Sequence, residues 1–508
     1  MITFIDLSIM FPGVHSNYIP YTLGILRCAQ TVKEAGYHVG LIQRPLYKDE
    51  KNWINELSIQ IANSNSEIIC FASRCDYYPH LLNLIKSIKK IRGNIIIIVG
   101  GIQASLTDIS TMEYCPEIDF IIRGEGESAL PRLIRLLIDD IKYIDIPGVT
   151  YRNNEKIVRD PDIEEINNID YLLDLDIIDY ADDLNCDCLY VEAGRGCTYN
   201  CQFCCTKTLW KRKYRLCPPD KVYQNMRLLY KRFGIKHFKF IHDNFLSGGD
   251  FYLFLNDFKN TDGFTWGGSA RIDALTNENI KLLAEKGCKQ IYCGIESGSL
   301  RMQKIYRKNL DLSVIPAIMN ALEKNGVSCT FSFIIGHPEE SYEDLNDTLT
   351  LAVECKKHYA CDEIQIHKLV PHAGSKLFDL YSKSLVFDNN ISDMSDISPE
   401  SFNLADFDAG KELFSSFYSF NNLNPDNYRI VNRANDISNF INAYSNVIAC
   451  ISKVCGMEII DVMNIFLETK NETALLAALK KLSLEYNGLD YREMKEQLSG
   501  ADFFYGNT

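Results

Sequence analysis

The chain has 508 residues, too many for one ordinary hydrophobic core, so we expect about two to four domains. Its 46% hydrophobic and 24% charged residues are typical of a globular protein, and no apolar run reaches the ~18–20 residues of a membrane span. The formal net charge of −14 argues against a nucleic-acid partner, because binding to phosphates depends on lysine and arginine.

Residues 1–140 alternate between apolar runs and amphipathic helical patterns. The N-terminal MITFIDLSIMFPG has no basic region or cleavage site, so we expect a strand there rather than a signal peptide. Five βα units at this spacing predict a doubly wound, Rossmann-like sheet with a ligand crevice at the carboxyl ends of its strands. The expected strands are Ile2–Ile9, His38–Gln43, Glu67–Ser73, Asn94–Gly101 and Asp119–Arg123. Helical patterns lie near Tyr21–Ala35, Lys51–Asn63, Pro79–Ile91, Ser105–Tyr114 and Ser128–Asp139.

Small and polar residues fall at the expected crevice of this sheet. They are Ser73, Arg74, Gly100, Gly101, Gly124 and Glu125. Glycines at such turns let the backbone approach a bulky ligand closely. No GxGxxG follows the first strand, so a purely structural domain and a nucleotide site both stay open at this point.

Residues 141–188 have the pattern of a connector. The segment IPGVTYRNNEKIV predicts a turn and then a hairpin around Asn153 and Asn154. The acidic, apolar stretch that follows has no sustained periodicity.

Three cysteines then stand close together in VEAGRGCTYNCQFCCTK. Cys197, Cys201 and Cys204 form a C-x3-C-x2-C run directly after a short apolar strand and a Gly-Arg-Gly turn. Structural zinc prefers four ligands in two separated pairs, so this loop suits an iron–sulfur cluster better. Three thiolates leave one iron of a 4Fe-4S cluster open to a further ligand. Cys205, next to the last thiol, is expected to be a packed residue rather than a ligand.

This loop resembles the signature of the radical S-adenosylmethionine (SAM) enzymes. The resemblance implies that the open iron binds SAM and that cleavage of SAM gives a 5'-deoxyadenosyl radical, which abstracts hydrogen from unactivated carbon. It also implies an electron donor such as flavodoxin or ferredoxin. The protein itself would orient the cofactors and exclude water.

A second β–α alternation runs from Leu189 to about Val370 and predicts the six-stranded partial barrel of this family. The expected strands are Leu189–Ala193, His237–His242, Phe264–Ser269, Gln290–Ile295, Ser328–Ile335 and Glu363–Leu369. Active sites of such barrels lie at the carboxyl ends of the strands. Polar residues there match family motifs: Arg271 resembles the partner of the SAM carboxylate, and Glu296 resembles the acid that binds the ribose. Asp243 and Ser269 are further candidates for SAM, and each of these residues has a structural role as its alternative.

Together with this loop, Gly100–Gly101 and the GEGE run at 124–127 make the first domain resemble the cobalamin-binding domain of the cobalamin-dependent radical SAM enzymes. The resemblance implies that the crevice residues bind cobalamin. The D-x-H-x-x-G motif that gives cobalt a histidine elsewhere is missing, as is usual in this branch. A domain that has lost its cofactor is the alternative. Arg74 suits either a place beneath the corrin or an ordinary salt bridge.

The segment after residue 380 loses the strand rhythm. Helical patterns lie at Ala409–Tyr418, Asp436–Val454, Met457–Thr469, Glu472–Tyr486 and Tyr491–Leu498. Nine Lys or Arg and fourteen Asp or Glu from Ala405 on exclude a basic appendage for gripping tRNA. The expected organisation is therefore α/β: a cobalamin-binding domain at 1–140, a connector at 141–188, a radical SAM barrel at 189–379 and a helical domain at 380–508.

The sequence thus predicts a cytoplasmic, cobalamin-dependent radical SAM enzyme with a 4Fe-4S cluster. Eighteen cysteines without a compact disulfide framework indicate a reducing compartment. The expected chemistry is methylation of unactivated carbon or phosphorus in a natural product, peptide or lipid. Alternatives are a cyclisation, ring contraction or rearrangement without methyl transfer, and a non-catalytic cofactor-binding protein. An RNA methylthiotransferase is disfavoured, because a second N-terminal cysteine cluster and a basic tail are both missing. No residue is assigned to catalysis.

Overall fold

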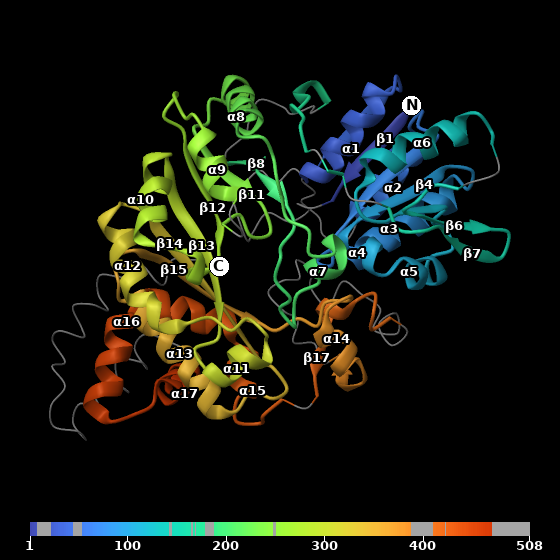
Figure 1. Ribbon diagram of the computed structural model, residues 1–508. Coiled ribbons are helices and arrows are strands. Elements are labelled where there is room, and N and C mark those ends of the chain that lie inside the picture. The colour runs from blue at the N-terminus through green and yellow to red at the C-terminus, as the bar shows by residue number, and fades with distance from the viewer. Residues whose placement is uncertain are drawn as a thin grey trace. The chain divides into compact units, whose positions relative to one another are not determined.

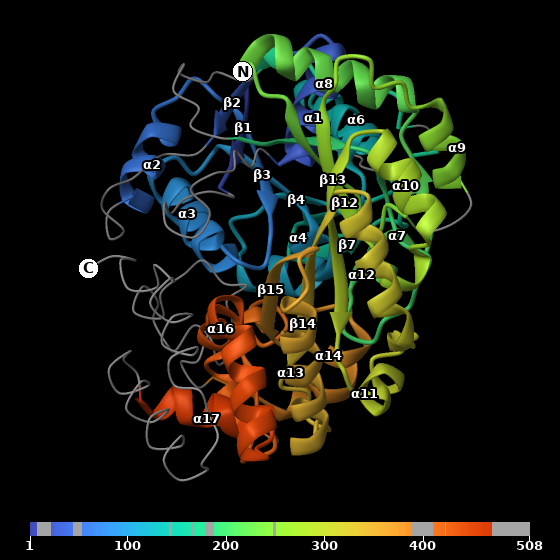
Figure 2. The same cartoon turned by 90° about the vertical axis from the view of Figure 1, so that its left-hand side faces the viewer.

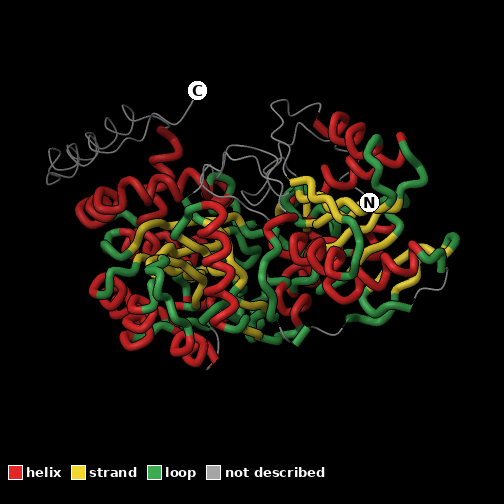
Figure 3. The backbone as a smooth tube through the Cα atoms, turned by 90° about the horizontal axis from the view of Figure 1, so that it is seen from above, coloured by secondary structure: helices red, strands yellow, loops and turns green. Residues whose placement is uncertain are grey.

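The computed structural model describes residues 1–7, 22–43, 53–141, 145–163, 166–167, 169–177, 187–246, 250–387, 410–421 and 423–469. The chain divides into two compact units. The first is Met1–Trp266 with Val370–Ser419, and the second is Gly267–Leu369 with Phe420–Thr508 (Figure 1). Strands flanked by helices occur in each unit, which confirms the predicted α/β class (Figure 3).

A seven-stranded sheet dominates the first unit, in the order β2-β1-β3-β4-β5-β6-β7. Its first five strands run parallel, as predicted, and β6 and β7 add an antiparallel edge. That edge is the predicted hairpin, with Asn153 at the end of β6 and the turn at Asn154 and Glu155. The strands are β1 (Ile2–Asp6), β2 (Val39–Gln43), β3 (Ile68–Ser73), β4 (Ile96–Gly101), β5 (Phe120–Ile122), β6 (Val149–Asn153) and β7 (Lys156–Arg159).

Helices cover both faces of the parallel part of this sheet. Helix α1 packs beside α6, and α2 packs beside α3 (Figure 2). The helices are α1 (Leu23–Glu34), α2 (Trp53–Ala62), α3 (Tyr78–Ile91), α4 (Ile102–Leu106), α5 (Asp108–Tyr114) and α6 (Gly126–Ile138). The single helix expected at 105–114 is wrong: the backbone leaves helical geometry at Thr107, where φ is −131°, and two short helices result.

The register of the central strands brings their carboxyl ends level with one another. In β3 every residue is buried, as expected for a strand covered on both faces. Ala72 pairs with Gly100 and Ser73 with Gly101, so β3 and β4 end side by side. This edge is where a doubly wound sheet binds its ligand.

The first unit continues with the cysteine-bearing segment. Strand β8 is parallel to β11, and the short β9 is antiparallel to β10. The elements are β8 (Leu189–Glu192), β9 (Gly194–Arg195), α7 (Thr206–Trp210), β10 (Arg215–Leu216), α8 (Pro219–Phe233), β11 (His237–Ile241) and α9 (Asp250–Asp257). Later residues of the unit form α14 (Lys376–Tyr381), β16 (Leu385–Val386) and the 3-10 turn Ser415–Phe417.

That 3-10 turn replaces a predicted α-helix. We expected a helix at Ala409–Tyr418, but the described residues 410–418 form turns around Ser415–Phe417. Phe414 and Phe417 are both buried. Their spacing of three residues reflects packing against the core. In so short a segment this spacing cannot be distinguished from a helical periodicity.

The second unit holds the remaining expected barrel strands. Strand β12 (Thr265–Ala270) begins in the first unit and ends in the second, and β13, β14 and β15 pair in parallel. The other elements are β13 (Cys288–Glu296), β14 (Ser328–Ile335), β15 (Cys361–Lys368), α10 (Asn277–Glu285), α11 (Leu300–Ile305), α12 (Ile315–Lys324), α13 (Tyr342–Lys356), α15 (Tyr428–Val431), α16 (Ala434–Cys455) and α17 (Ile459–Thr469).

All six predicted barrel strands are therefore found, and α16 and α17 match two of the expected C-terminal helices. The helices expected at 472–486 and 491–498 lie outside the described residues, as does Ser8 in the expected first strand. Among the helices of the described ranges, none combines the length and the apolar character that crossing a membrane requires.

Candidate active site

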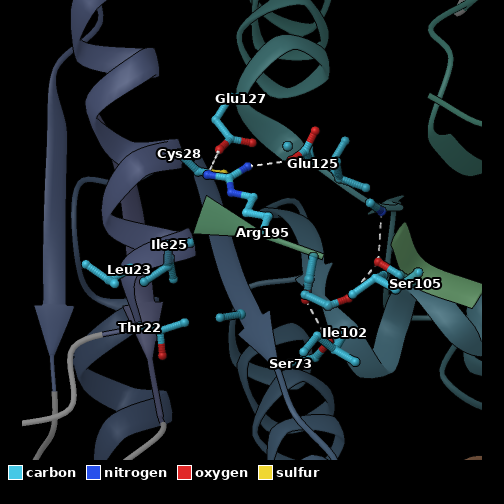
Figure 4. Close-up of a pocket in the computed structure, with 18 of the residues that line it drawn as sticks. Thr22, Leu23, Ile25, Cys28, Ser73, Ile102, Ser105, Glu125, Glu127 and Arg195 are labelled. Atoms are coloured by element: carbon cyan, nitrogen blue, oxygen red, sulfur yellow. Dashed lines mark hydrogen bonds and ion pairs between the residues drawn. The ribbon is translucent and has the colours of Figure 1, made fainter. Parts of the chain in front are cut away.

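A cavity of about 490 Å³ opens at the carboxyl edge of the first unit's sheet. All six residues that the sequence predicted for cobalamin line it, and so does Asp243. The six are Ser73, Arg74, Gly100, Gly101, Gly124 and Glu125. Figure 4 shows several of these residues around the cavity, with α1 on one side and the loops after the strands on the other. The structure thus brings the predicted crevice residues together, while their role in binding a cofactor stays a prediction.

The glycines at this edge are required by close backbone approach. Gly101 has φ of +97°, and a Cβ placed on it would lie 2.6 Å from the Ser73 carbonyl oxygen. The Ser73 hydroxyl donates a hydrogen bond to the Gly100 carbonyl oxygen (2.7 Å) and accepts one from the Ala104 amide (2.9 Å). The cavity wall here is bare backbone held in place by one buried serine.

Arg74 lines the cavity beside a buried carboxylate. Its guanidinium lies 2.8 Å from Asp76, and about half of the Arg74 side chain is exposed whereas Asp76 is almost fully buried. Both alternatives for this residue therefore find a structural basis, since it is salt-bridged and also lines the cavity.

The three predicted cluster ligands lie in one loop between β9 and α7. All three cysteines are half-buried, and Cys205 serves as the N-cap residue of α7. The Thr206 amide donates to the Cys204 sulfur (3.4 Å), and the Asn244 side-chain amide lies 4.0 Å from the Cys197 sulfur. Such N–H groups near cysteine sulfur tune the potential of a bound cluster.

This donor set does not converge on a single point. Within the described residues, no three His, Cys, Asp or Glu side chains are arranged to hold one metal ion. A 4Fe-4S cluster binds each thiolate through a different iron, so its ligands are spread apart. The assignment of these three cysteines to a cluster stays a prediction.

The residues after β11 contact the start of the cysteine loop. Asp243 accepts a hydrogen bond from the Gly196 amide (2.7 Å), and burial raises the pKa of its carboxyl group. His242 also lines the cavity, but Nδ1 accepts from the Asn244 amide and Nε2 lies 3.2 Å from the Arg215 carbonyl oxygen. Burial lowers the pKa of His242 to about 4. Both ring nitrogens of His242 therefore have partners within the protein.

The second unit gathers two of the residues predicted for SAM around a lysine. Arg271 binds both carboxylate oxygens of Asp273 (3.0 and 2.7 Å) and donates to the Lys308 carbonyl oxygen (2.9 Å). Glu296 is ion-paired with the ammonium group of the same Lys308. A Cβ on Gly294 would lie 2.3 Å from Glu296 Oε1, so a side chain there would displace this pair. Ser269 is half-buried on β12.

Sequence reasoning missed Lys308 in the second unit and a charged group in the first. Arg195 is bonded to Glu125, Glu127 and Glu192, and Arg215 also bonds Glu125. The Gly-Arg-Gly turn was noticed for its glycines alone. The positive charge of Arg195 between these glycines was the signal that could have been used. Two of its partners, Glu125 and Glu127, lie about 70 residues earlier in the sequence.

Two family models match the chain. The B12 binding domain matches residues 12–134, and the radical SAM superfamily matches residues 191–352. The first covers β2, β3, β4 and β5 of the sheet that forms the cavity, and the second begins in β8, directly before the cysteine loop.

Among the proteins with similar sequences, one is named as a methyltransferase and another as a cyclase. An uncharacterized methyltransferase of Pyrococcus horikoshii is 28% identical over 303 residues, which are 58% of this chain and 64% of that protein. The anaerobic magnesium-protoporphyrin IX monomethyl ester cyclase of Rubrivivax gelatinosus is 25% identical over 52% of this chain and 50% of the cyclase. The chain thus spans less than two thirds of either relative.

A solved structure shows the same fold. The radical SAM methyltransferase TsrM from Kitasatospora setae, with cobalamin and a 4Fe-4S cluster bound, matches with a TM-score of 0.63 at 14% identity. The match covers 82% of this chain and 86% of that one. At this identity the likeness is one of fold.

Proposed function

We propose that this chain, which combines a B12 binding domain with a radical SAM domain and so belongs to the cobalamin-dependent radical SAM enzymes, is a methyltransferase. Its substrate is a natural product, peptide or lipid, and the methyl acceptor is an unactivated carbon, or a phosphorus, of that molecule. The name of the Pyrococcus horikoshii relative supports methyl transfer.

One observation carries the proposal. A single cavity within the first unit is lined both by the glycine-rich strand ends of the B12 binding domain and by residues that flank the cysteine loop. From the first set come Gly100 and Gly101, and from the second Arg195, Trp210 and Asp243. A methyl carrier bound in this cavity lies beside the loop where the radical is made.

The chain's own residues have separate tasks in this scheme. When bound, the cluster with SAM supplies a carbon radical and cobalamin supplies a methyl group. Cys197, Cys201 and Cys204 hold the cluster, and the bare backbone at Gly100–Gly101 admits the corrin face. Arg271 would bind the SAM carboxylate and Glu296 would accept hydrogen bonds from the ribose, each in exchange for its present ion pair with Asp273 or Lys308. Apolar side chains of the cavity exclude water.

A cyclase is the second candidate function. The Rubrivivax gelatinosus relative is named as a cyclase, and its 25% identity is close to that of the methyltransferase relative. The cofactors alone do not separate the two reactions, because both begin with hydrogen abstraction.

Counting products separates them. The reconstituted enzyme is supplied with SAM carrying a deuterated methyl group and with a metabolite extract from cells lacking its gene. A methyltransferase yields about one S-adenosylhomocysteine and about one 5'-deoxyadenosine per product, and the product carries the label. An unlabelled product formed without S-adenosylhomocysteine contradicts methyl transfer and favours the cyclase or a rearrangement.

The proposal includes a cytoplasmic location and an electron donor such as flavodoxin or ferredoxin. The eighteen cysteines support a reducing compartment, since a thiolate loop must stay reduced to bind iron. The net charge of −14 supports a partner other than nucleic acid.

A further inference from the structure

Arg195 ends β9, directly before the cysteine loop, and lies between Gly194 and Gly196. A Cβ on Gly194 would lie 2.2 Å from the Arg215 carbonyl oxygen, and one on Gly196 would lie 1.8 Å from the Lys213 carbonyl oxygen. Neither position can take a side chain without moving the backbone. The backbone at both glycines therefore packs closely against the backbone of residues 213–215, and the Arg195 side chain projects from between them.

The guanidinium of Arg195 binds three carboxylates at once. Nη1 lies 2.7 Å from Glu125, Nη2 lies 2.7 Å from Glu127, and Nε lies 2.6 Å from Glu192. The Arg195 side chain is only 9% exposed, and Glu125 only 1%. Figure 4 shows Arg195 reaching toward Glu125 and Glu127 at the cavity. A planar guanidinium with donors on three sides suits this arrangement, which an ammonium group cannot reproduce.

The partners of Arg195 belong to the cavity wall. Glu125 is the N-cap residue of α6, and Glu127 lies in the first turn of that helix, directly after β5. Burial raises the pKa of the Glu125 carboxyl group, but Arg215 and Arg195 outweigh it, so that this pKa lies below its usual value. Arg195, Glu125, Glu127 and Glu192 all line the cavity. Arg195 is also two residues from Cys197, the first cluster ligand.

We propose that Arg195 is a positioning residue that couples the corrinoid cavity to the cluster loop, so that filling either site strengthens binding at the other. The inference rests on the proposed function, because it requires both cofactors. Arg195 lies directly before the cysteine loop in the chain and is bonded to the residues that shape the cavity, so a change on either side acts on the same ion-pair network. By linkage, the cluster must then change corrinoid affinity by the same factor as the corrinoid changes cluster affinity.

The experiment measures hydroxocobalamin affinity by absorbance, for the full chain with and without its reconstituted cluster. The parent should bind the corrinoid about 5- to 150-fold more tightly when the cluster is present. In Arg195→Lys this ratio should fall to about one, because a lysine keeps the charge but cannot hold three carboxylates together. Iron content, measured on the same samples, should be higher with corrinoid than without it in the parent and should no longer depend on corrinoid in this variant.

The matched control is Arg123→Lys. The Arg123 side chain is 4% exposed, is ion-paired with Asp108 at the start of α5 and with Asp162 after β7, and is not among the residues that line the cavity. It should keep the parent's ratio even if its stability falls. A parent ratio of one, an unchanged ratio in Arg195→Lys, or an equal loss in Arg123→Lys would each overturn the coupling. A parent that binds neither iron nor corrinoid would instead contradict the proposed function.

Discussion

The cysteines of the loop after β9 differ in what each is expected to do. Because three thiolates must hold the irons, changing Cys197, Cys201 or Cys204 to alanine should abolish formation of 5'-deoxyadenosine. Cys205→Ala is the matched control: this neighbouring cysteine is the N-cap of α7, and its loss should largely spare SAM cleavage. An anaerobically reconstituted Cys201→Ala protein that still makes 5'-deoxyadenosine contradicts the assignment.

Arg271 and Glu296 converge on Lys308, which places a cation and an anion at one site of the second unit. Losing a charge-assisted hydrogen bond costs about 1.5–3 kcal/mol, or roughly ten- to hundred-fold in an equilibrium constant. Arg271→Ala should therefore weaken SAM binding, measured by equilibrium dialysis, by that order while iron and corrinoid contents stay unchanged. Glu296→Gln should have a smaller effect, since it keeps an acceptor.

The control for this pair is Glu339→Gln. Glu339 is exposed beyond the end of β14, and its change should leave SAM affinity as it is. If Arg271→Ala binds SAM like the parent, the barrel residues do not bind SAM in the predicted way and only the cysteine loop remains supported.

Glu340 makes the stability of the second unit depend on pH. Its carboxylate accepts a hydrogen bond from the Gly336 amide (2.7 Å), and burial raises its pKa from 4.5 to about 8. Between these values the native protein holds a proton that the unfolded chain has released, so stability falls as pH rises. Glu340→Gln removes this titration. Its melting temperature relative to the parent should rise steadily from about pH 5 to about pH 8.

Differential scanning fluorimetry across that pH range checks this expectation. Glu339→Gln again serves as the control, because this neighbouring carboxylate is exposed. A difference between Glu340→Gln and the parent that stays constant with pH would mean that Glu340 is ionised in the folded protein throughout.

The elements themselves were largely predictable, because buried parallel strands are apolar runs that end at glycine or at polar residues. The run IIIIVGG gave both β4 and its ligand-facing end, and the pairing of Ser73 with Gly101 follows from parallel register. The break at Thr107 and the 3-10 turn at Ser415–Phe417 were not predictable, since short segments keep helical spacing without helical backbone.

Contacts between distant elements were beyond the sequence for a different reason. Arg195 finds Glu125 and Glu127 only because β9 lies near the start of α6 in the folded unit. Lys308 likewise meets Glu296 only after the chain turns back toward the end of β13. Long-range ion pairs follow from how elements pack, and charge patterns along the chain do not specify that packing.

The approach of β3 and β4 at the cavity can be tested through Gly101. Gly101→Ala would bring a Cβ to 2.6 Å from the Ser73 carbonyl oxygen, so the cavity wall must shift and corrinoid content should fall. Gly36→Ala is a close control, because Gly36 has a similar φ of +93° with no atom within 4 Å. Equal corrinoid contents in the two variants would show that this wall does not touch the corrinoid.

Across the whole molecule, the account requires that one chain carries both cofactors. The B12 binding domain and the cysteine loop lie in one compact unit, where residues of the domain and residues that flank the loop line one cavity, and the predicted SAM residues Arg271 and Glu296 belong to the other unit.

The most direct test counts iron, corrinoid and 5'-deoxyadenosine in one sample of the full chain, reconstituted anaerobically with iron, sulfide and hydroxocobalamin and then given SAM and a reductant. We expect about four irons and about one corrinoid per chain, with absorbance lacking the signature of histidine ligation, and formation of 5'-deoxyadenosine. A protein that cleaves SAM fully while retaining no corrinoid, or that retains corrinoid but never cleaves SAM, would contradict the account.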